Sequence, residues 1–205
     1  MPTYPHMQLG EFAQIFVGLA RQSKAFSAQP EQPEIGLIGM KAIRPSGVDL
    51  QAIEYVQVAA EESLSVNRVA ENDVLITCRG TEIRLALAPR QTEGMLIDSN
   101  ILAIRSEPIL SAILLATFFH HPLGMSQLER ASQSTTTQKN LTVRAVKKIT
   151  VPVPPAEAQR QISRLVLTAE KQYGLAAQCA ERRLAIARQI AVDLMFEKEM
   201  EGKQK

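Results

Sequence analysis

The first half of the chain is patterned as short strands separated by polar turns. Three compact apolar stretches are typical of strands: Ile35 to Ile43, Tyr55 to Val58, and Asp73 to Cys78. Glu82 to Ala88 alternates apolar and polar positions after a turn at Arg79 and Gly80. We therefore expect residues 73–88 to form a hairpin or a pair of sheet strands. A further strand is expected from Asn100 to Arg105.

Two other apolar segments are patterned differently. Leu9 to Leu19 has apolar residues at helical or mixed spacing, ahead of a polar stretch from Arg21 to Glu34 that indicates a loop. Ile109 to Phe119 is strongly apolar and predicts a helix, because Pro122 and Gly124 follow and stop it.

An unbroken polar run separates the next two predicted elements. A short helix is expected from Met125 to Ala131, and a last short strand from Ile149 to Val153. Between them, Ser132 to Asn140 contains only polar side chains, which predicts a loop. Such a loop is either a plain connector or a surface with many hydrogen-bonding groups, and the pattern alone leaves both open.

The last quarter of the chain predicts one long helix. Glu157 to about Glu199 has no proline and a single glycine, Gly174. Apolar positions recur at spacings of three and four with one stutter, which is the pattern of a helix that packs against another long helix. This seam consists of Ile162, Val166, Ala169, Tyr173, Ala176, Ala180, Leu184, Ala187, Ala191 and Leu194.

The length of this helix decides between two ways of covering the seam. At 1.5 Å per residue it would extend for about 60 Å, which is more than a domain of this size can cover. We therefore expect a coiled coil with a second chain, most simply a homodimer, because a symmetric interface needs only one sequence. The alternative is a helix that folds back along its own domain.

These elements predict an α+β fold with a helical appendage. Residues 1–153 would form a domain with a small mixed or antiparallel sheet and short helices. Residues 154–200 would form the long helix for dimerisation or spacing, and residues 201–205 a disordered tail.

Composition narrows the class of protein. The chain has 205 residues, of which 45% are hydrophobic and 21% are charged, as expected for a soluble protein with a real core. Cys78 and Cys179 are far apart, so a disulfide framework is not expected and a reducing cytoplasm is the natural setting. The N-terminus lacks the pattern of a signal peptide, and no apolar stretch is long enough to span a membrane.

Charge is unevenly distributed although the net charge is only +2. Acidic residues dominate positions 54–73, whereas positions 130–152 contain no acid. The basic residues of that second stretch are Arg130, Lys139, Arg144, Lys147 and Lys148. One local surface is therefore expected to be positive, as contact with phosphates requires, although a solvated charge run beside a strand has the same pattern.

The sequence offers little that points to catalysis. No glycine-rich phosphate loop is present. His120 and His121 lack further ligands at metal-binding spacing, so a role at a helix C-terminus is the better interpretation. Cys78 lies in an apolar strand pattern and is interpreted as a buried structural thiol. A small hydrolase that uses Cys78 stays open as an alternative and predicts a thiol that reacts readily.

Four segments, in this order, resemble the specificity subunit of Type I restriction-modification systems. The last is the most specific, because a strand with a proline-rich end and then Glu-x-Gln opens the long helix of that family. That family has a strand motif Gly-Asp-Ile-Leu, which residues 72–75 resemble, with Asn72 in place of the usual glycine. The segments are Leu9 to Glu11, Glu71 to Thr81, Leu141 to Ile149, and Val151 to Ile162.

The resemblance implies a function and a set of partners. Residues 1–153 would be a DNA target-recognition domain, and the chain would be non-catalytic. The family's subunits have two recognition domains and two helices, whereas this sequence has one of each, so it resembles a half-subunit. Two copies would pair their helices antiparallel and read a bipartite site. The implied partners are adenine-methylating subunits, which bring S-adenosylmethionine, and a translocating nuclease subunit.

Base reading needs hydrogen-bonding side chains in the major groove and cations on the flanking phosphates. In the polar loop we expect Gln133, Gln138 and Asn140 to read bases and Lys139 to contact a phosphate, followed by the basic segment Arg144 to Lys148. The loop residues Ser134, Thr135, Thr136 and Thr137 belong to the same candidate surface, with weaker candidates at Lys41, Arg44, Arg79, Thr81 and Arg84.

Two interpretations of these candidates stay open. Arg79 and Thr81 could instead stabilise a turn, whereas Arg84 is expected to point outward from its strand. A coiled-coil adaptor that binds only protein is the alternative to DNA recognition, and it predicts no salt-dependent DNA binding.

Overall fold

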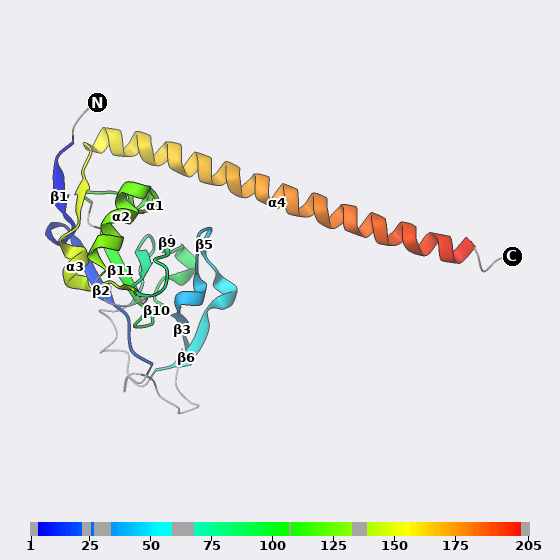
Figure 1. The fold of residues 1–205 in the computed structure, drawn as a ribbon, viewed down its shortest axis with the longest axis horizontal. Coiled ribbons are helices and arrows are strands. Elements are labelled where there is room, and N and C mark those ends of the chain that lie inside the picture. Colours follow the sequence, from blue (N-terminus) through cyan, green and yellow to red (C-terminus); the bar gives the residue numbers. More distant parts are fainter. Residues whose placement is uncertain are drawn as a thin grey trace. The chain divides into compact units, whose positions relative to one another are not determined.

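The computed structural model describes most of the chain. The described residues are 4–21, 26, 34–58, 68–106, 108–132 and 139–201, with side chains up to Phe196. They divide into two compact units, Met1–Ser163 and Arg164–Lys205. Among the described residues, no helix is both long enough and apolar enough to cross a membrane. Figure 1 follows the order of the elements along the chain.

A four-stranded antiparallel sheet lies at the centre of the first unit. Its strands follow the order β2 (Ala13–Val17), β11 (Ile101–Ser106), β7 (Val74–Thr77) and β9 (Leu85–Leu87). The pairing of β7 with β9 confirms the strand pair expected within residues 73–88. β11 pairs with both β2 and β7, so it has a neighbour on each side.

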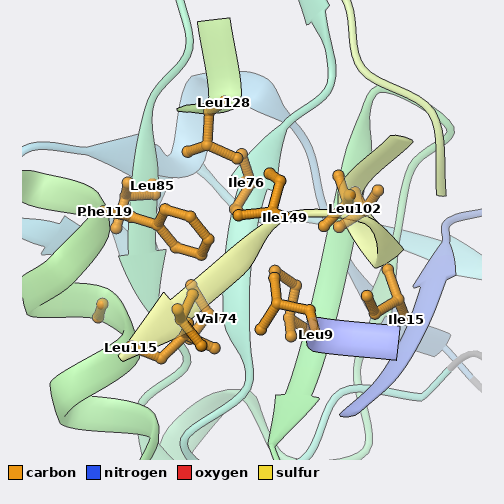
Figure 2. Packing of buried hydrophobic residues seen from close by; sticks show 14 of the residues in the cluster. Leu9, Ile15, Val74, Ile76, Leu85, Leu102, Leu115, Phe119, Leu128 and Ile149 are labelled. Carbon is orange, nitrogen blue, oxygen red and sulfur yellow. The ribbon is translucent and has the colours of Figure 1, made fainter. Parts of the chain in front are cut away.

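Both faces of this sheet are apolar, because side chains alternate along each strand. On β11, Leu102 and Ile104 face one hydrophobic cluster, whereas Ile101 and Ala103 face another. Figure 2 shows the first cluster, in which sheet residues such as Ile76 meet helical residues. The labelled residues are Leu9, Ile15, Val74, Ile76, Leu85, Leu102, Leu115, Phe119, Leu128 and Ile149.

Three helices contribute to the first cluster: α1 (Ala112–His120), α2 (Pro122–Ala131) and α3 (Val143–Lys147). α1 ends at His120, directly ahead of the Pro122 and Gly124 segment, as expected, whereas the second helix begins at Pro122 and not at the expected Met125. Pro122 begins α2, where its missing N–H costs nothing. Gly124 lies inside α2, and a Cβ there would come within 2.0 Å of the Phe118 carbonyl oxygen. Only glycine therefore fits this close approach.

Smaller strands cover the other face of the sheet. The expected strand from Ile35 to Ile43 is broken in two by a 3-10 turn, in which the Ala42 amide bonds to the Gly39 carbonyl. The elements here are β3 (Glu34–Ile38), η2 (Met40–Ala42), β4 (Ile43–Arg44), β5 (Gly47–Val48), η3 (Leu50–Ala52), β6 (Glu54–Gln57), η5 (Arg90–Thr92) and β10 (Leu96–Ile97). Of the paired strands, β10 and β3 run parallel.

The two ends of the first unit are joined by a strand pair. β1 (His6–Gln8) pairs antiparallel with β13 (Thr150–Pro152). The mixed spacing after β1 corresponds to a short 3-10 turn, η1 (Leu9–Glu11), and then β2. Leu9 is fully buried, and its amide donates to the Ile149 carbonyl at 2.9 Å.

The long helix α4 (Ala156–Glu201) begins within the first unit. Gln159 is 9% exposed, and its side chain anchors the first turns. Its Oε1 accepts from the Ser111 amide at 2.9 Å, and its Nε2 donates to the carbonyls of Ile109 and Pro154 at 2.7 and 2.8 Å. Glu201 is helical, whereas residues 202–205 of the expected tail lie outside the described residues.

Most of α4 exposes large apolar side chains. Ile162, the first residue of the predicted seam, packs against the first cluster of its own domain. Tyr173, Leu184 and Leu194 of the seam are exposed. The exposed apolar surface is wider than the seam, because it also includes Leu165, Leu167, Leu175, Ile186, Ile190, Val192, Met195 and Phe196.

A buried ion pair holds the start of β7 to β11. Asp73 is 1% exposed, and its oxygens accept from Arg105 Nε at 2.9 Å and Nη2 at 2.7 Å. The hydrogen bond to Asp73 raises the pKa of Arg105, so the guanidinium stays charged. Asn72 just before has φ 68°, a conformation that asparagine and glycine tolerate. Asparagine therefore fits this turn, at the position where the motif that the strand resembles has glycine.

Removing the carboxylate of Asp73 should destabilise the first unit. We expect Asp73→Ala to lower the free energy of unfolding by about 3 kcal/mol, because it leaves the Arg105 charge partly buried without its partner. Urea unfolding measures this loss. As a control, Glu54→Ala removes the exposed Arg21–Glu54 pair and should cost under about 1 kcal/mol. Equal losses in both variants would contradict the structural role given to Asp73.

Truncating Gln159 should loosen the start of α4. Gln159→Ala leaves one amide and two carbonyls without their partner, so we expect a loss of about 2 kcal/mol in the free energy of unfolding. Gln161→Ala is the matched control, since Gln161 is exposed and its side chain donates to Glu157 of the same helix. Thermal unfolding of both variants compares their stabilities. Unchanged stability of Gln159→Ala would show that the Gln159 hydrogen bonds do not stabilise the start of α4.

Candidate nucleic-acid interface

A two-residue strand pair brings distant candidate segments together. β8 (Arg79–Gly80) pairs antiparallel with β12 (Lys139–Asn140), with Asn140 opposite Arg79 and Lys139 opposite Gly80. The Leu141 amide extends the contact by donating to the Cys78 carbonyl at 2.8 Å. The predicted turn and the end of the polar loop therefore form one surface.

Most of the polar loop cannot be placed on this surface. Residues Gln133, Ser134, Thr135, Thr136, Thr137 and Gln138 lie outside the described residues. Ser132 is buried, and its hydroxyl donates to the Glu129 carbonyl at 2.8 Å. The loop therefore starts at the fixed end of α2 and finishes at β12.

A buried hydroxyl shapes the turn between β8 and β9. Thr77 is 1% exposed, and its Oγ1 accepts from the Arg84 amide at 2.8 Å and donates to the Glu82 carbonyl at 3.1 Å. Gly80 has φ 123°, which a residue with a side chain rarely adopts. Thr81 is exposed at this turn. Sequence reasoning overlooked Thr77, whose only signal is a hydroxyl in an otherwise apolar strand.

Lys139 is already paired. Its Nζ lies 2.9 Å from Glu129 Oε1 of α2, with the two side chains 28% and 52% exposed. An exposed pair of this kind is worth about 1 kcal/mol or less, so a phosphate could displace Glu129 at small cost. Glu129 was not among the sequence candidates, and it is the acid that partners this lysine in the protein.

The segment with Lys41 and Arg44 lies beside the same turn. A Cβ at Gly80 would come within 3.8 Å of Met40 Sδ, so η2 borders β8. Both Lys41 and Arg44 are exposed, and Arg44 Nε lies 3.7 Å from Asp49 Oδ2. β8 is therefore bordered by both of the other candidate segments, which are separate from it in sequence.

The expected outward orientation of Arg84 is wrong. Its side chain is half-buried, and Nη1 donates to the Ile43 carbonyl at 3.1 Å. This bond ties the turn before β9 to β4. Arg84 therefore positions the segments that carry the exposed cations.

The two histidines lie at helix ends. His120 is the last residue of α1, and its Nδ1 lies 3.0 Å from the Ala116 carbonyl. His121 caps α2, since its Nδ1 accepts from the Leu123 amide at 3.3 Å. No group of three or more potential metal ligands occurs within the described part of the chain.

The solved structures that resemble this chain share a class of fold. This chain is similar to the HsdS subunit from Thermoanaerobacter tengcongensis, with a TM-score of 0.60 and 18% sequence identity. The superposition covers 87% of this chain and 40% of the HsdS chain. A structure described as showing complex assembly and conformational transition of the type I R-M system gives TM-score 0.64 and 19% identity, with 86% and 40% covered. The fold is therefore that of specificity subunits.

The sequence gives the family. The model for the Type I restriction modification DNA specificity domain matches residues 3–176. The chain belongs to this family. It spans about two-fifths of the length of the solved subunits, including the Type-I system S subunit from M. genitalium, which has TM-score 0.50, 16% identity, and 85% and 41% covered. A comparison with curated protein sequences gave no match.

The buried thiol gives a test of the hydrolase alternative. Cys78 is 3% exposed, and burial raises its pKa, whereas Cys179 is exposed. We expect Cys78 to stay unmodified by a thiol reagent at pH 8 in the native protein and to react only on unfolding, because the thiolate is the reactive form. Counting labelled thiols in wild type and Cys78→Ala measures this. Rapid native labelling at Cys78 would revive the hydrolase interpretation.

Proposed function

We propose that this chain is a half-subunit that recognises a specific DNA sequence for a Type I restriction-modification complex. The observation that carries the proposal is the β8–β12 pair, which sets Arg79 beside Asn140 at the end of the polar loop. Membership of the specificity-domain family over residues 3–176 supports it. The chain itself is proposed to be non-catalytic.

DNA reading on this surface divides between two kinds of contact. The side-chain amides of Asn140, Gln133 and Gln138 would face base edges in the major groove. Such an amide can form two hydrogen bonds with one adenine. Lys41, Arg44, Arg79 and Lys139 would contact phosphates and fix the register of the protein on the duplex. Arg84 would position the surface, because its side chain is committed to the Ile43 carbonyl.

Dimerisation through α4 is supported by its exposed apolar side chains. In an antiparallel coiled coil of two copies, the seam residues from Val166 to Leu194 would be covered, and the two domains would read inversely repeated half-sites. The 46-residue helix would set the spacer between them. Because the exposed apolar surface is wider than one seam, it also leaves room for helices of partner subunits.

The partners follow from the family. An adenine-methylating subunit would bring S-adenosylmethionine, and a translocating nuclease subunit would complete the restriction complex, both in the cytoplasm. The protein-only adaptor is the competing proposal, favoured by the apolar surface of α4 alone. It leaves the exposed cations Lys41 and Arg79 without a role.

Methylation mapping tests the proposed function. The chain is co-expressed with a candidate adenine methyltransferase subunit from the same genome, and N6-methyladenine is mapped across the host DNA. We expect a bipartite motif with two inversely repeated halves, because the dimer is symmetric. Stable association without any DNA methylation or binding at low salt would favour the adaptor instead.

A matched pair of variants tests the reading surface. Asn140→Ala should relax the preference for one base of the motif and cost about 1–3 kcal/mol in discrimination there. Arg90→Ala is the control, since η5 lies at the opposite end of the β7–β9 pair from the turn. An unchanged motif in the Asn140 variant would remove this residue from base reading.

A further inference from the structure

α3 presents a second set of cations, separate from the β8–β12 surface. Val146 of this helix is fully buried, and the Thr142 hydroxyl accepts from the Ala145 amide at 3.2 Å. These contacts fix the helix against the domain. Arg144, Lys147 and Lys148 are consequently exposed on its outer side.

Two hollows flank these cations and share Lys148. One, of about 330 Å³, lies between α2 and α3 and includes Arg130 and Gln127. The other, of about 650 Å³, lies between α3 and the η1 segment and includes Arg144 and Lys147. Gly10 forms part of its wall, where a Cβ would lie 3.0 Å from Lys147 Cβ. The cations therefore line two neighbouring hollows, which we together name the α3 surface.

The charges of the α3 surface are not neutralised within the protein. No ion pair joins Arg130, Arg144, Lys147 or Lys148 to a carboxylate among the described residues, and Arg130 bonds only to Ser126. Among the described residues that line the two hollows, Glu11 is the one acid. Lys139 and Arg105, by contrast, each have an acidic partner. Clustered cations repel one another, and a polyanion relieves that repulsion.

We infer that the α3 surface binds the phosphate backbone of DNA next to the bases that the β8–β12 surface reads. The inference rests on the proposed function. Asn140 and Arg144 are four residues apart, so their backbones lie within about 14 Å of each other. Phosphates follow every 3.4 Å along the axis of each DNA strand, so a duplex on β12 places several phosphates within this distance. An acidic protein partner has no such geometric link to β12.

This contact adds affinity without sequence preference. The side chains are cations, and phosphates carry the same charge whatever the base sequence, so these side chains attract phosphates of any sequence. Each phosphate contact contributes about 0.9 to the slope of log affinity against log salt. The α3 surface should therefore contribute to salt-dependent binding, whereas the β8–β12 surface determines which bases are selected.

A triple variant of the full chain, purified with its methyltransferase subunit, tests the inference. Arg144→Gln, Lys147→Gln and Lys148→Gln are combined, and binding to a duplex with the methylated motif and to a scrambled duplex is measured from low to moderate salt. We expect the salt slope to fall by about 2–3. Affinity should fall by the same factor for both duplexes, and the methylated motif should stay unchanged.

Controls separate this inference from the proposed function. A variant with Arg90→Gln, Lys171→Gln and Arg188→Gln removes the same charge elsewhere and should keep the wild-type slope. If the first triple variant is unstable, each single substitution should lower the slope by about 0.9. An unchanged slope, or loss of methyltransferase binding with normal DNA binding, overturns the α3 inference alone. Wild-type complex that shows no salt-dependent DNA binding overturns both proposals.

Discussion

The central constraint on this fold is that strand β11 is apolar on both sides. Ile101 and Ala103 face one cluster and Leu102 and Ile104 face the other, and all four are fully buried. A sheet with two apolar faces is stable only when both are covered. The three short helices cover one face, and the broken strands around η2 cover the other. The remaining elements are arranged to meet this requirement.

The candidate DNA surface forms where the two coverings meet at one end of the sheet. The turn after β7 runs from Cys78 to Arg84, and β12 reaches it from the helical side while η2 and β4 reach it from the other. Thr77 and Arg84 use their polar groups to hold this junction. Short exposed segments thus acquire fixed positions from a rigid sheet, as recognition requires.

Patterning predicted the elements that carry an uninterrupted run or repeat of apolar residues, and it failed where partners come from distant segments. β7, β9, β11, α1 and α4 could be expected, because each has a run of apolar residues with clear limits. The break at Gly39 and the inward turn of Arg84 depend on contacts with other segments, such as the Ile43 carbonyl. The pairing of Arg79 with Asn140 joins two-residue strands and leaves no periodic signal. The exposed apolar surface of α4 is wider than the predicted seam, because a repeat of three and four residues describes only one stripe of a helix.

The pairing of β1 with β13 has a consequence for evolution. β1 (His6–Gln8) is the first strand of the first unit and β13 (Thr150–Pro152) is the last element before α4, and these strands are direct neighbours. An exchange of the coding sequence between these two points would replace the whole domain while both junctions stay side by side. Gln159 lies beyond the second junction, so the helix would keep its own half of the anchor and need only backbone groups from the incoming domain. Such an exchange would change the proposed specificity in one step and leave α4 unaltered.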